Sequence, residues 1–128
     1  MILIIGIPNS GKTTYSENFE KVIHYDDFKL TTLDRHIQIL ILIKNNDNIC
    51  IEGVYEDSKR RKDLIREAKF KNEKTICIWL NTPVEECIRR ELENPRHLLS
   101  SIKYFSQIFE PPTYKEGWDE IIEIKGEK

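Results

Sequence analysis

The sequence has 128 residues and a formal net charge of −2, and its pI is about 6.0. A chain of this length is expected to fold as one domain over residues 1–128, with a buried core and no room for a second catalytic unit. The charge balance excludes a global positive field that would recruit nucleic acid, so any such contact would need a local basic patch.

A glycine-rich loop follows the first predicted strand, residues 2–5, which is short and apolar. The loop has the form G-x-x-x-x-G-K-T, and residues 14–19 after it are expected to start a helix. In this context the pattern predicts a phosphate-binding P-loop, whose backbone N–H groups donate to phosphate oxygens. Lys12 would reach the β and γ phosphates of ATP, and Thr13 would ligate Mg²⁺. The candidate ATP-binding residues are Gly6, Pro8, Asn9, Ser10, Gly11, Lys12, Thr13 and Thr14.

Two carboxylates close the second predicted strand, residues 22–25. Asp26 is the best candidate for a general base, because it lies on the side where a phosphate acceptor would enter. The alternative is that Asp26 and Asp27 cap the segment that follows. Thr31 then begins a capping box with Asp34 in the place of Glu, which predicts a helix as far as residue 43. Residues 39–43 alone would also fit a buried strand.

Glu52 closes the third predicted strand, residues 49–51. A carboxylate there would hold Mg²⁺ through water or orient a side chain beside Lys12; the alternative is a solvated strand end. A charged helix is expected over residues 57–71. Its basic run, residues 59–62, is either a polyanion contact or, as such runs usually are, a solvated face.

The fourth predicted strand, residues 75–80, is apolar along its whole length, which is typical of a parallel sheet covered on both faces. Residues 82–85 form a second capping box, and the helix it starts is broken at Asn94 and Pro95. An amphipathic segment over residues 98–109 and a last strand over residues 121–124 complete the chain. This alternation predicts an α/β fold with a mostly parallel five-stranded sheet, and ligands bind beyond the carboxyl ends of such strands.

Several stretches resemble the small P-loop kinases that include the bacteriophage-type 5′-hydroxyl polynucleotide kinase. The matching residues are 4–14, 25–29, 51–55 followed by Arg60 and Arg61, 82–90, and 109–119. The resemblance implies a three-layer P-loop kinase fold with strand order 2-3-1-4-5 and a short helical lid. It also implies ATP and Mg²⁺ as cofactors, Asp26 as the base, and Arg90 or Arg96 as the lid cation.

The resemblance further implies a hydroxyl acceptor held near Asp27, Lys29 and Glu52. A polynucleotide 5′ end is the leading expectation, and a small metabolite, a nucleoside or an RNA-linked group is the close alternative. A nucleotide-binding module that signals to a partner is the alternative from another class. Asp26 lies on the side where an acceptor would enter, which favours phosphoryl transfer over a nucleotide-binding module.

The three cysteines, Cys50, Cys77 and Cys87, have no C-x-x-C spacing and lie in apolar surroundings. They are expected to be buried free thiols of a cytoplasmic protein. The apolar residues 1–5 lack a basic leader, which argues against a signal peptide. No apolar run approaches the length needed to cross a bilayer.

Overall fold

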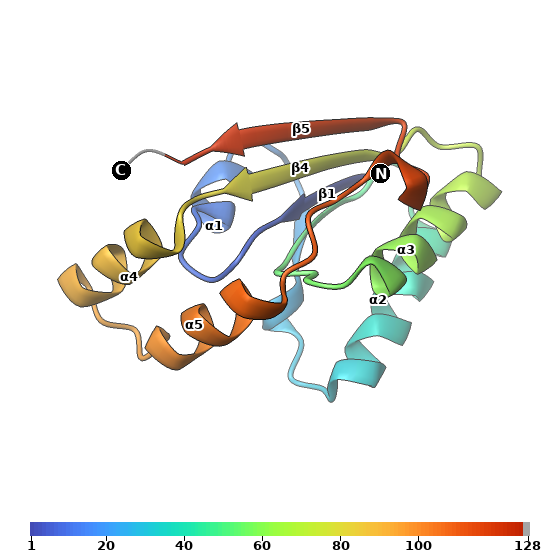
Figure 1. The fold of residues 1–128 in the computed structure, drawn as a ribbon. Coiled ribbons are helices and arrows are strands. Elements are labelled where there is room, and N and C mark those ends of the chain that lie inside the picture. Colours follow the sequence, from blue (N-terminus) through green and yellow to red (C-terminus); the bar gives the residue numbers. More distant parts are fainter. Residues whose placement is uncertain (127–128) are drawn as a thin grey trace.

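A computed structural model describes residues 1–126 of the chain. Strands and helices alternate along it (Figure 1). The strands are β1 (Ile2–Ile5), β2 (Val22–His24), β3 (Cys50–Glu52), β4 (Ile76–Asn81) and β5 (Glu120–Lys125). The α-helices are α1 (Lys12–Ser16), α2 (Thr32–Asn45), α3 (Ser58–Phe70), α4 (Val84–Glu93) and α5 (Leu99–Ile108), and two short 3-10 helices are η1 (Tyr25–Asp27) and η2 (Tyr114–Glu116).

The five strands form one parallel sheet in the order β2-β3-β1-β4-β5. This confirms the predicted parallel sheet and the strand order implied by the resemblance. In the register, Ile4 and His24 both lie opposite Glu52, from the strands on either side of β3. The carboxyl ends of β1, β2 and β3 therefore lie at the same edge of the sheet.

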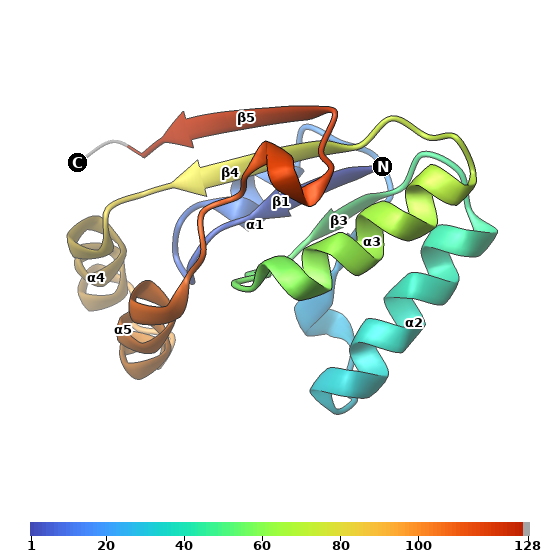
Figure 2. The same cartoon turned by 45° about the vertical axis from the view of Figure 1, so that its right-hand side comes forward.

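Helices α2 and α3 pack side by side on one face of the sheet, as Figure 2 shows. The core on this face joins strand residues such as Leu3 and Ile51 to Ile39 and Ile43 of α2. On the other face, α1 and the segment after it contribute Tyr15 and Phe19 to a second apolar cluster that includes Ile4 and Ile78. Helices α4 and α5 lie beyond the carboxyl end of β4 (Figure 1) and share a third cluster with Ile7.

The segment after Thr31, whose residues 39–43 would also have fitted a buried strand, is a helix. Thr31 caps it by accepting the Asp34 N–H across 3.2 Å. Ile39 and Ile43 are fully buried while Ile41 is 44% exposed, which is the pattern of a helix and not of a strand buried on both faces. The three cysteines are buried and free, as expected. Among the helices of residues 1–126, none combines the length and the apolarity that a membrane span requires.

Helix α1 differs from its prediction at both ends. It begins at Lys12, two residues before the expected start at Thr14, and it ends at Ser16 instead of continuing through Phe19. The P-loop lysine is therefore the first residue of the helix itself. The five-residue helix buries only Lys12 and Ser16.

Candidate active site

The P-loop leaves β1 at Gly6 and turns back on itself through left-handed backbone conformations. Asn9 has φ of 66° and Gly11 has φ of 102°; asparagine tolerates such a conformation better than most residues, whereas the larger angle at Gly11 favours glycine. At Gly6 a Cβ atom would lie 2.9 Å from the carbonyl oxygen of Leu80 and 2.5 Å from the Ser10 Oγ. The loop is therefore closed in a way that a side chain at Gly6 would disrupt.

Lys12 lies under this loop. Its Nζ donates to the carbonyl oxygen of Ile7 across 3.0 Å, and the side chain is buried. Burial lowers the pKa of Lys12, and the negative charges of Glu52 and Asp26 oppose that shift. The sheet register agrees with this, because Glu52 lies beside β1 and β2, and Asp26 directly follows β2 at the same edge.

The other P-loop side chains divide between solvent and the interior. Thr13 and Thr14 are exposed, and Pro8 is half-buried. The Ser10 hydroxyl is buried, and it finds no hydrogen-bond partner in the described part of the chain. A buried polar group without a partner is unfavourable.

Thr82, which directly follows β4, forms a hydrogen bond with the P-loop. The sequence did not reveal this contact. The Thr82 hydroxyl donates to the carbonyl oxygen of Ser10 across 2.8 Å. The prediction that Thr82 caps the following helix is wrong, because Pro83 is the N-cap residue of α4 and no side chain caps it. A Thr-Pro pair at a strand end fits either role, and only the folded arrangement distinguishes them.

The carboxylates that follow β2 face solvent. Asp26 and Asp27 are exposed in η1, as is Lys29 after it. Their side chains make no hydrogen bond or ion pair to residues 1–126. The capping alternative for Asp26 and Asp27 is therefore not realised, since α2 is capped by Thr31.

Glu52 is buried and paired, which overturns the alternative of a solvated strand end. Its Oε1 lies 2.7 Å from the Nδ1 of His24, the last residue of β2. No sequence motif pointed to His24. The position of His24 could have predicted its pairing with Glu52, because a residue at the end of β2 is expected beside the end of β3 when these strands are neighbours in a parallel sheet.

The lid consists of α4, α5 and residues 94–98 between them, and its arginines are placed differently. Arg90 donates from Nη1 to the carbonyl oxygen of Asn9 across 2.8 Å and from Nε to Glu86 across 2.9 Å. Arg89 pairs with Glu86 and Glu93. Arg96 is exposed, has no ion pair within residues 1–126, and its positive charge contributes to the lowered pKa of Lys12, although burial of that amine is the larger cause.

Glu91 connects the lid to the P-loop and was missed in the sequence. Its Oε2 accepts the backbone N–H groups of Arg96 and Leu98, each across 3.0 Å. Its Oε1 accepts the side-chain amide of Asn9 across 3.4 Å. Although burial acts against it, these N–H donors hold the pKa of Glu91 below its usual value.

The basic run at residues 59–62 is divided: Lys59 and Lys62 are exposed, whereas the two arginines are paired. Arg60 pairs with Glu56 and Asp57. Arg61 is fully buried, and its Nε and Nη2 bind the two carboxylate oxygens of Glu116 across 2.9 and 3.0 Å. Both arginines are therefore neutralised within the fold.

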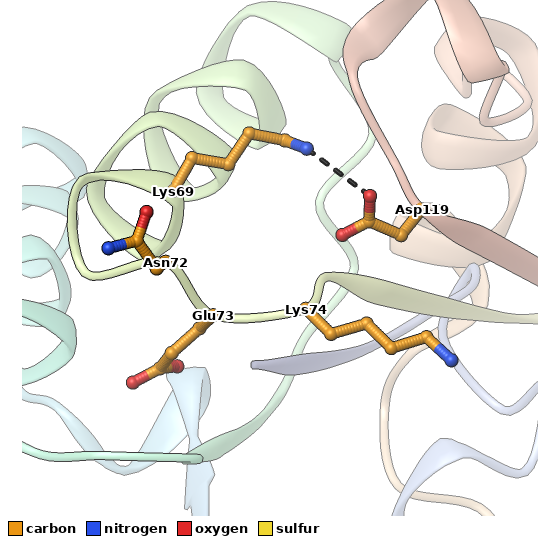
Figure 3. Close-up of a pocket in the computed structure, with 5 residues that line it drawn as sticks. All are labelled: Lys69, Asn72, Glu73, Lys74 and Asp119. Carbon is orange, nitrogen blue, oxygen red and sulfur yellow. Dashed lines mark hydrogen bonds and ion pairs between the residues drawn. The ribbon is translucent and has the colours of Figure 1, made fainter.

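A surface hollow of about 580 Å³ lies at the opposite edge of the sheet (Figure 3). Its lining residues are Lys69, Asn72, Glu73, Lys74 and Asp119. Lys69 pairs with Asp119 in this hollow, and Glu73 and Lys74 pair with Lys71 and Glu120. Its charged groups thus have protein partners, and it is separated from the P-loop by the length of β4.

Metal ligands are sparse at the carboxyl edge. Residues 1–126 contain no group of three or more His, Cys, Asp or Glu side chains arranged to hold a metal ion. Mg²⁺ does not need such a group, because it binds through one or two protein oxygens together with water and phosphate. The exposed Thr13 hydroxyl at the start of α1, with Asp26 and Glu52 near Lys12, fits that requirement.

Comparison with known proteins finds similarity in sequence and in fold. No family model matches the chain. In sequence it is 22% identical over 142 aligned residues to the L-seryl-tRNA(Sec) kinase of Methanococcus maripaludis, in an alignment that covers 93% of this chain. The alignment covers 56% of that kinase, so the chain spans little more than half the length of this relative.

Two solved structures resemble the fold over nearly its whole length. Kti12 from Chaetomium thermophilum, in complex with ADP-AlF3, superposes with a TM-score of 0.74 at 17% identity over 97% of this chain and 88% of that chain. A gluconokinase from Sinorhizobium meliloti superposes with a TM-score of 0.71 at 13% identity over 99% of this chain and 82% of that chain. The chain thus has the three-layer α/β fold of P-loop kinases, with a parallel five-stranded sheet and a short helical lid.

Proposed function

We propose that this chain is an ATP-dependent kinase that transfers a phosphoryl group to a hydroxyl of a small acceptor. One observation carries the proposal: the buried P-loop amine of Lys12 lies at the edge of the sheet where β3 ends in Glu52 and β2 leads into Asp26. A phosphate cradle beside an exposed, unpaired carboxylate is what transfer to an alcohol needs.

Each residue has a role in this proposal. Residues 6–14 cradle the triphosphate, with Ser10 offering its buried hydroxyl and Lys12 its amine. Thr13 ligates Mg²⁺, and Glu52 supports it through water. Bound ATP with Mg²⁺ would supply the phosphoryl group. Asp26 accepts the proton of the acceptor hydroxyl, and Asp27 and Lys29 line the acceptor side.

The lid arginines divide two tasks. Arg90 already uses Nη1 and Nε within the protein, so it positions the P-loop. Arg96 is exposed and unpaired within residues 1–126, and its charge reaches Lys12. We assign to Arg96 the neutralisation of charge on the transferring group, a task for which a guanidinium is suited.

A small acceptor is preferred here over the polynucleotide 5′ end that the sequence resemblance implied. Two of the four expected cations at residues 59–62 are occupied, because Arg60 and Arg61 pair with carboxylates of the fold. The similar proteins reported above include a gluconokinase and an L-seryl-tRNA(Sec) kinase. An RNA-linked hydroxyl is the second candidate, supported by the latter relative, which aligns over most of this chain.

A transfer assay with γ-labelled ATP tests the proposal. The acceptor panel contains gluconate and related sugars, nucleosides, serylated tRNA and a 5′-hydroxyl oligonucleotide, and the Lys12→Ala variant gives the background. Acceptor-dependent transfer to a small alcohol is the expected result. Transfer of the label to the oligonucleotide alone would instead support the hypothesis that the acceptor is a polynucleotide 5′ end. ATP binding with no transfer to any acceptor would favour a nucleotide-binding module instead.

A further inference from the structure

Arg35 carries a positive charge that the described part of the protein leaves without an anionic partner. It lies in the first turn of α2, and its side chain is half-buried. Its Nε is buried and makes no hydrogen bond, and Arg35 forms no ion pair with residues 1–126. A partly desolvated guanidinium without a carboxylate is unfavourable, which makes an external anion a stabilising partner.

The guanidinium of Arg35 is held in place by the ring of Tyr25. Its central carbon lies over that ring, 5.2 Å from the centroid. The edge of Tyr55 packs against Tyr25 with 5.4 Å between the ring centroids, and Arg60 donates to the Tyr25 hydroxyl across 3.2 Å. Because the ring is fixed on two sides, the cation above it is preorganised.

Arg60 provides an internal comparison, since it lies near the same ring, 5.8 Å from the centroid. Its guanidinium bonds to Asp57, to Glu56 and to the Tyr25 hydroxyl. One arginine at Tyr25 is therefore neutralised by the protein, whereas Arg35 is not. The planar fork of Arg35 is free to bind a carboxylate or a phosphate with two parallel hydrogen bonds.

The position of Arg35 connects it to the proposed reaction. Tyr25, on which it stacks, directly precedes Asp26 in η1. The short helix η1 therefore carries both the proposed base and the ring that holds Arg35, so an acceptor bound along η1 would meet both groups. We propose that the acceptor of this kinase carries an oxyanion, a carboxylate or a phosphate, that Arg35 binds. This inference rests on the proposed function and adds the substrate class.

The test uses matched alcohols that differ in one anionic group. Three sets serve: glycerol with glycerate and glycerol 3-phosphate, glucose with gluconate and glucose 6-phosphate, and ribose with ribose 5-phosphate. The wild-type protein should prefer an anionic member over its neutral partner by roughly tenfold or more in kcat/KM, the scale of a charge-assisted hydrogen bond. The carboxylate and phosphate members identify which oxyanion is bound.

Two variants of Arg35 and one control complete the design. Arg35→Gln should remove the preference by raising KM for the anionic acceptor while kcat changes little, because the contact is present before and during transfer. Arg35→Lys keeps the charge and should retain part of the preference. Arg66→Gln, at an exposed arginine of α3 paired with Asp63, should behave as wild type. Melting temperatures verify that each variant folds.

The outcomes separate the inference from the proposed function. If wild-type protein transfers phosphate and Arg35→Gln leaves the preference unchanged, or if neutral alcohols are preferred, the role of Arg35 is wrong and the kinase assignment stands. If folded wild-type protein binds ATP but phosphorylates no alcohol in any set, the small-acceptor kinase assignment fails, and the inference fails with it.

Discussion

Arg90 donates from Nη1 to the carbonyl oxygen of Asn9 across 2.8 Å, which ties helix α4 directly to the P-loop backbone. The same guanidinium donates from Nε to Glu86, one turn earlier on α4. The P-loop is therefore supported on two sides, by this contact and by the Thr82 hydroxyl on Ser10. Arg90 therefore supports the P-loop through hydrogen bonds, whereas the side chain of Arg96 is exposed.

Alanine substitution should distinguish the two arginines. Arg96→Ala should lower kcat by roughly 10²–10³, the usual effect of removing one group that stabilises transition-state charge, with an unchanged melting temperature. Arg90→Ala should instead lower the melting temperature and raise KM for ATP, because the P-loop loses a support. Steady-state kinetics and thermal unfolding measure both. Arg66→Ala is the control, and equal kinetic defects in the two lid variants would refute the division.

Lys12→Ala should abolish transfer and weaken ATP binding while the fold stays intact. The amine is buried against the carbonyl oxygen of Ile7, and in the proposed function it belongs to the phosphate cradle, not to an apolar cluster. Calorimetric titration of ATP and a circular dichroism melt provide the measurements. Lys44→Ala, at an exposed position near the end of α2, is the matched control. Normal turnover by Lys12→Ala would remove the P-loop from the mechanism.

Local patterns predicted the helices and strands because the determinants of these elements are local, whereas the strand order came from the family resemblance. Apolar runs marked all five strands, and the G-x-x-x-x-G-K-T motif marked the loop that follows β1. The contacts that shape the site join distant segments, such as His24 with Glu52 and Thr82 with Ser10, so no single stretch encodes them. For the same reason the sequence did not predict the hydrogen bonds that Glu91 accepts from Asn9, Arg96 and Leu98.

The burial of Arg61 is different, because a local signal for it existed. It shares the buried stripe of α3 with Leu64, Ile65 and Ala68, at the spacing i, i+3, i+4 and i+7. The prediction of a solvated face was based on the basic run at residues 59–62. It gave the charge of these residues more weight than the helical spacing of Arg61. The periodicity was the better guide, since Glu116 supplies the compensating charge.

Arg61→Met should lower the free energy of unfolding by about 3–5 kcal/mol, because it leaves the Glu116 carboxylate buried without its cation. Glu116 keeps only the Trp118 indole N–H and the Thr113 backbone N–H as donors in the described part of the chain. Urea unfolding measures the change. Lys62→Met, at the exposed neighbouring position, should cost far less. Similar losses in the two variants would contradict the pairing argument.

Acid should loosen α4 through Glu86. Hydrogen bonds from Arg89, together with those from Arg90, lower the pKa of Glu86 to about 2 from 4.5. A carboxylate with a lowered folded-state pKa contributes stability that is complete above the unfolded value near 4.5 and is lost as the pH falls towards 2. The melting temperature should therefore fall less steeply between these values in Glu86→Gln than in wild type.

The control for this acid dependence is Glu85→Gln, an exposed neighbour without an ion pair in residues 1–126. Its profile should follow wild type. Glu91 also has a lowered pKa and destabilises the protein in the same direction on protonation, so only the difference between variant and wild type reports on Glu86. Parallel profiles for wild type and Glu86→Gln would show that the Arg89 and Arg90 pairs do not stabilise α4.

Asp26→Asn separates an enzyme from a binding module. Asp26 is exposed and forms no hydrogen bond or ion pair with residues 1–126, so the substitution removes a proton acceptor without removing a structural contact. Transfer should fall by about 10²-fold or more, the scale of general-base loss, while ATP affinity changes little. Asp47→Asn, at an exposed carboxylate in the turn before β3, is the control. An Asp26→Asn variant that melts early and binds ATP poorly would instead make Asp26 a structural residue, and undiminished transfer would assign the base to another group.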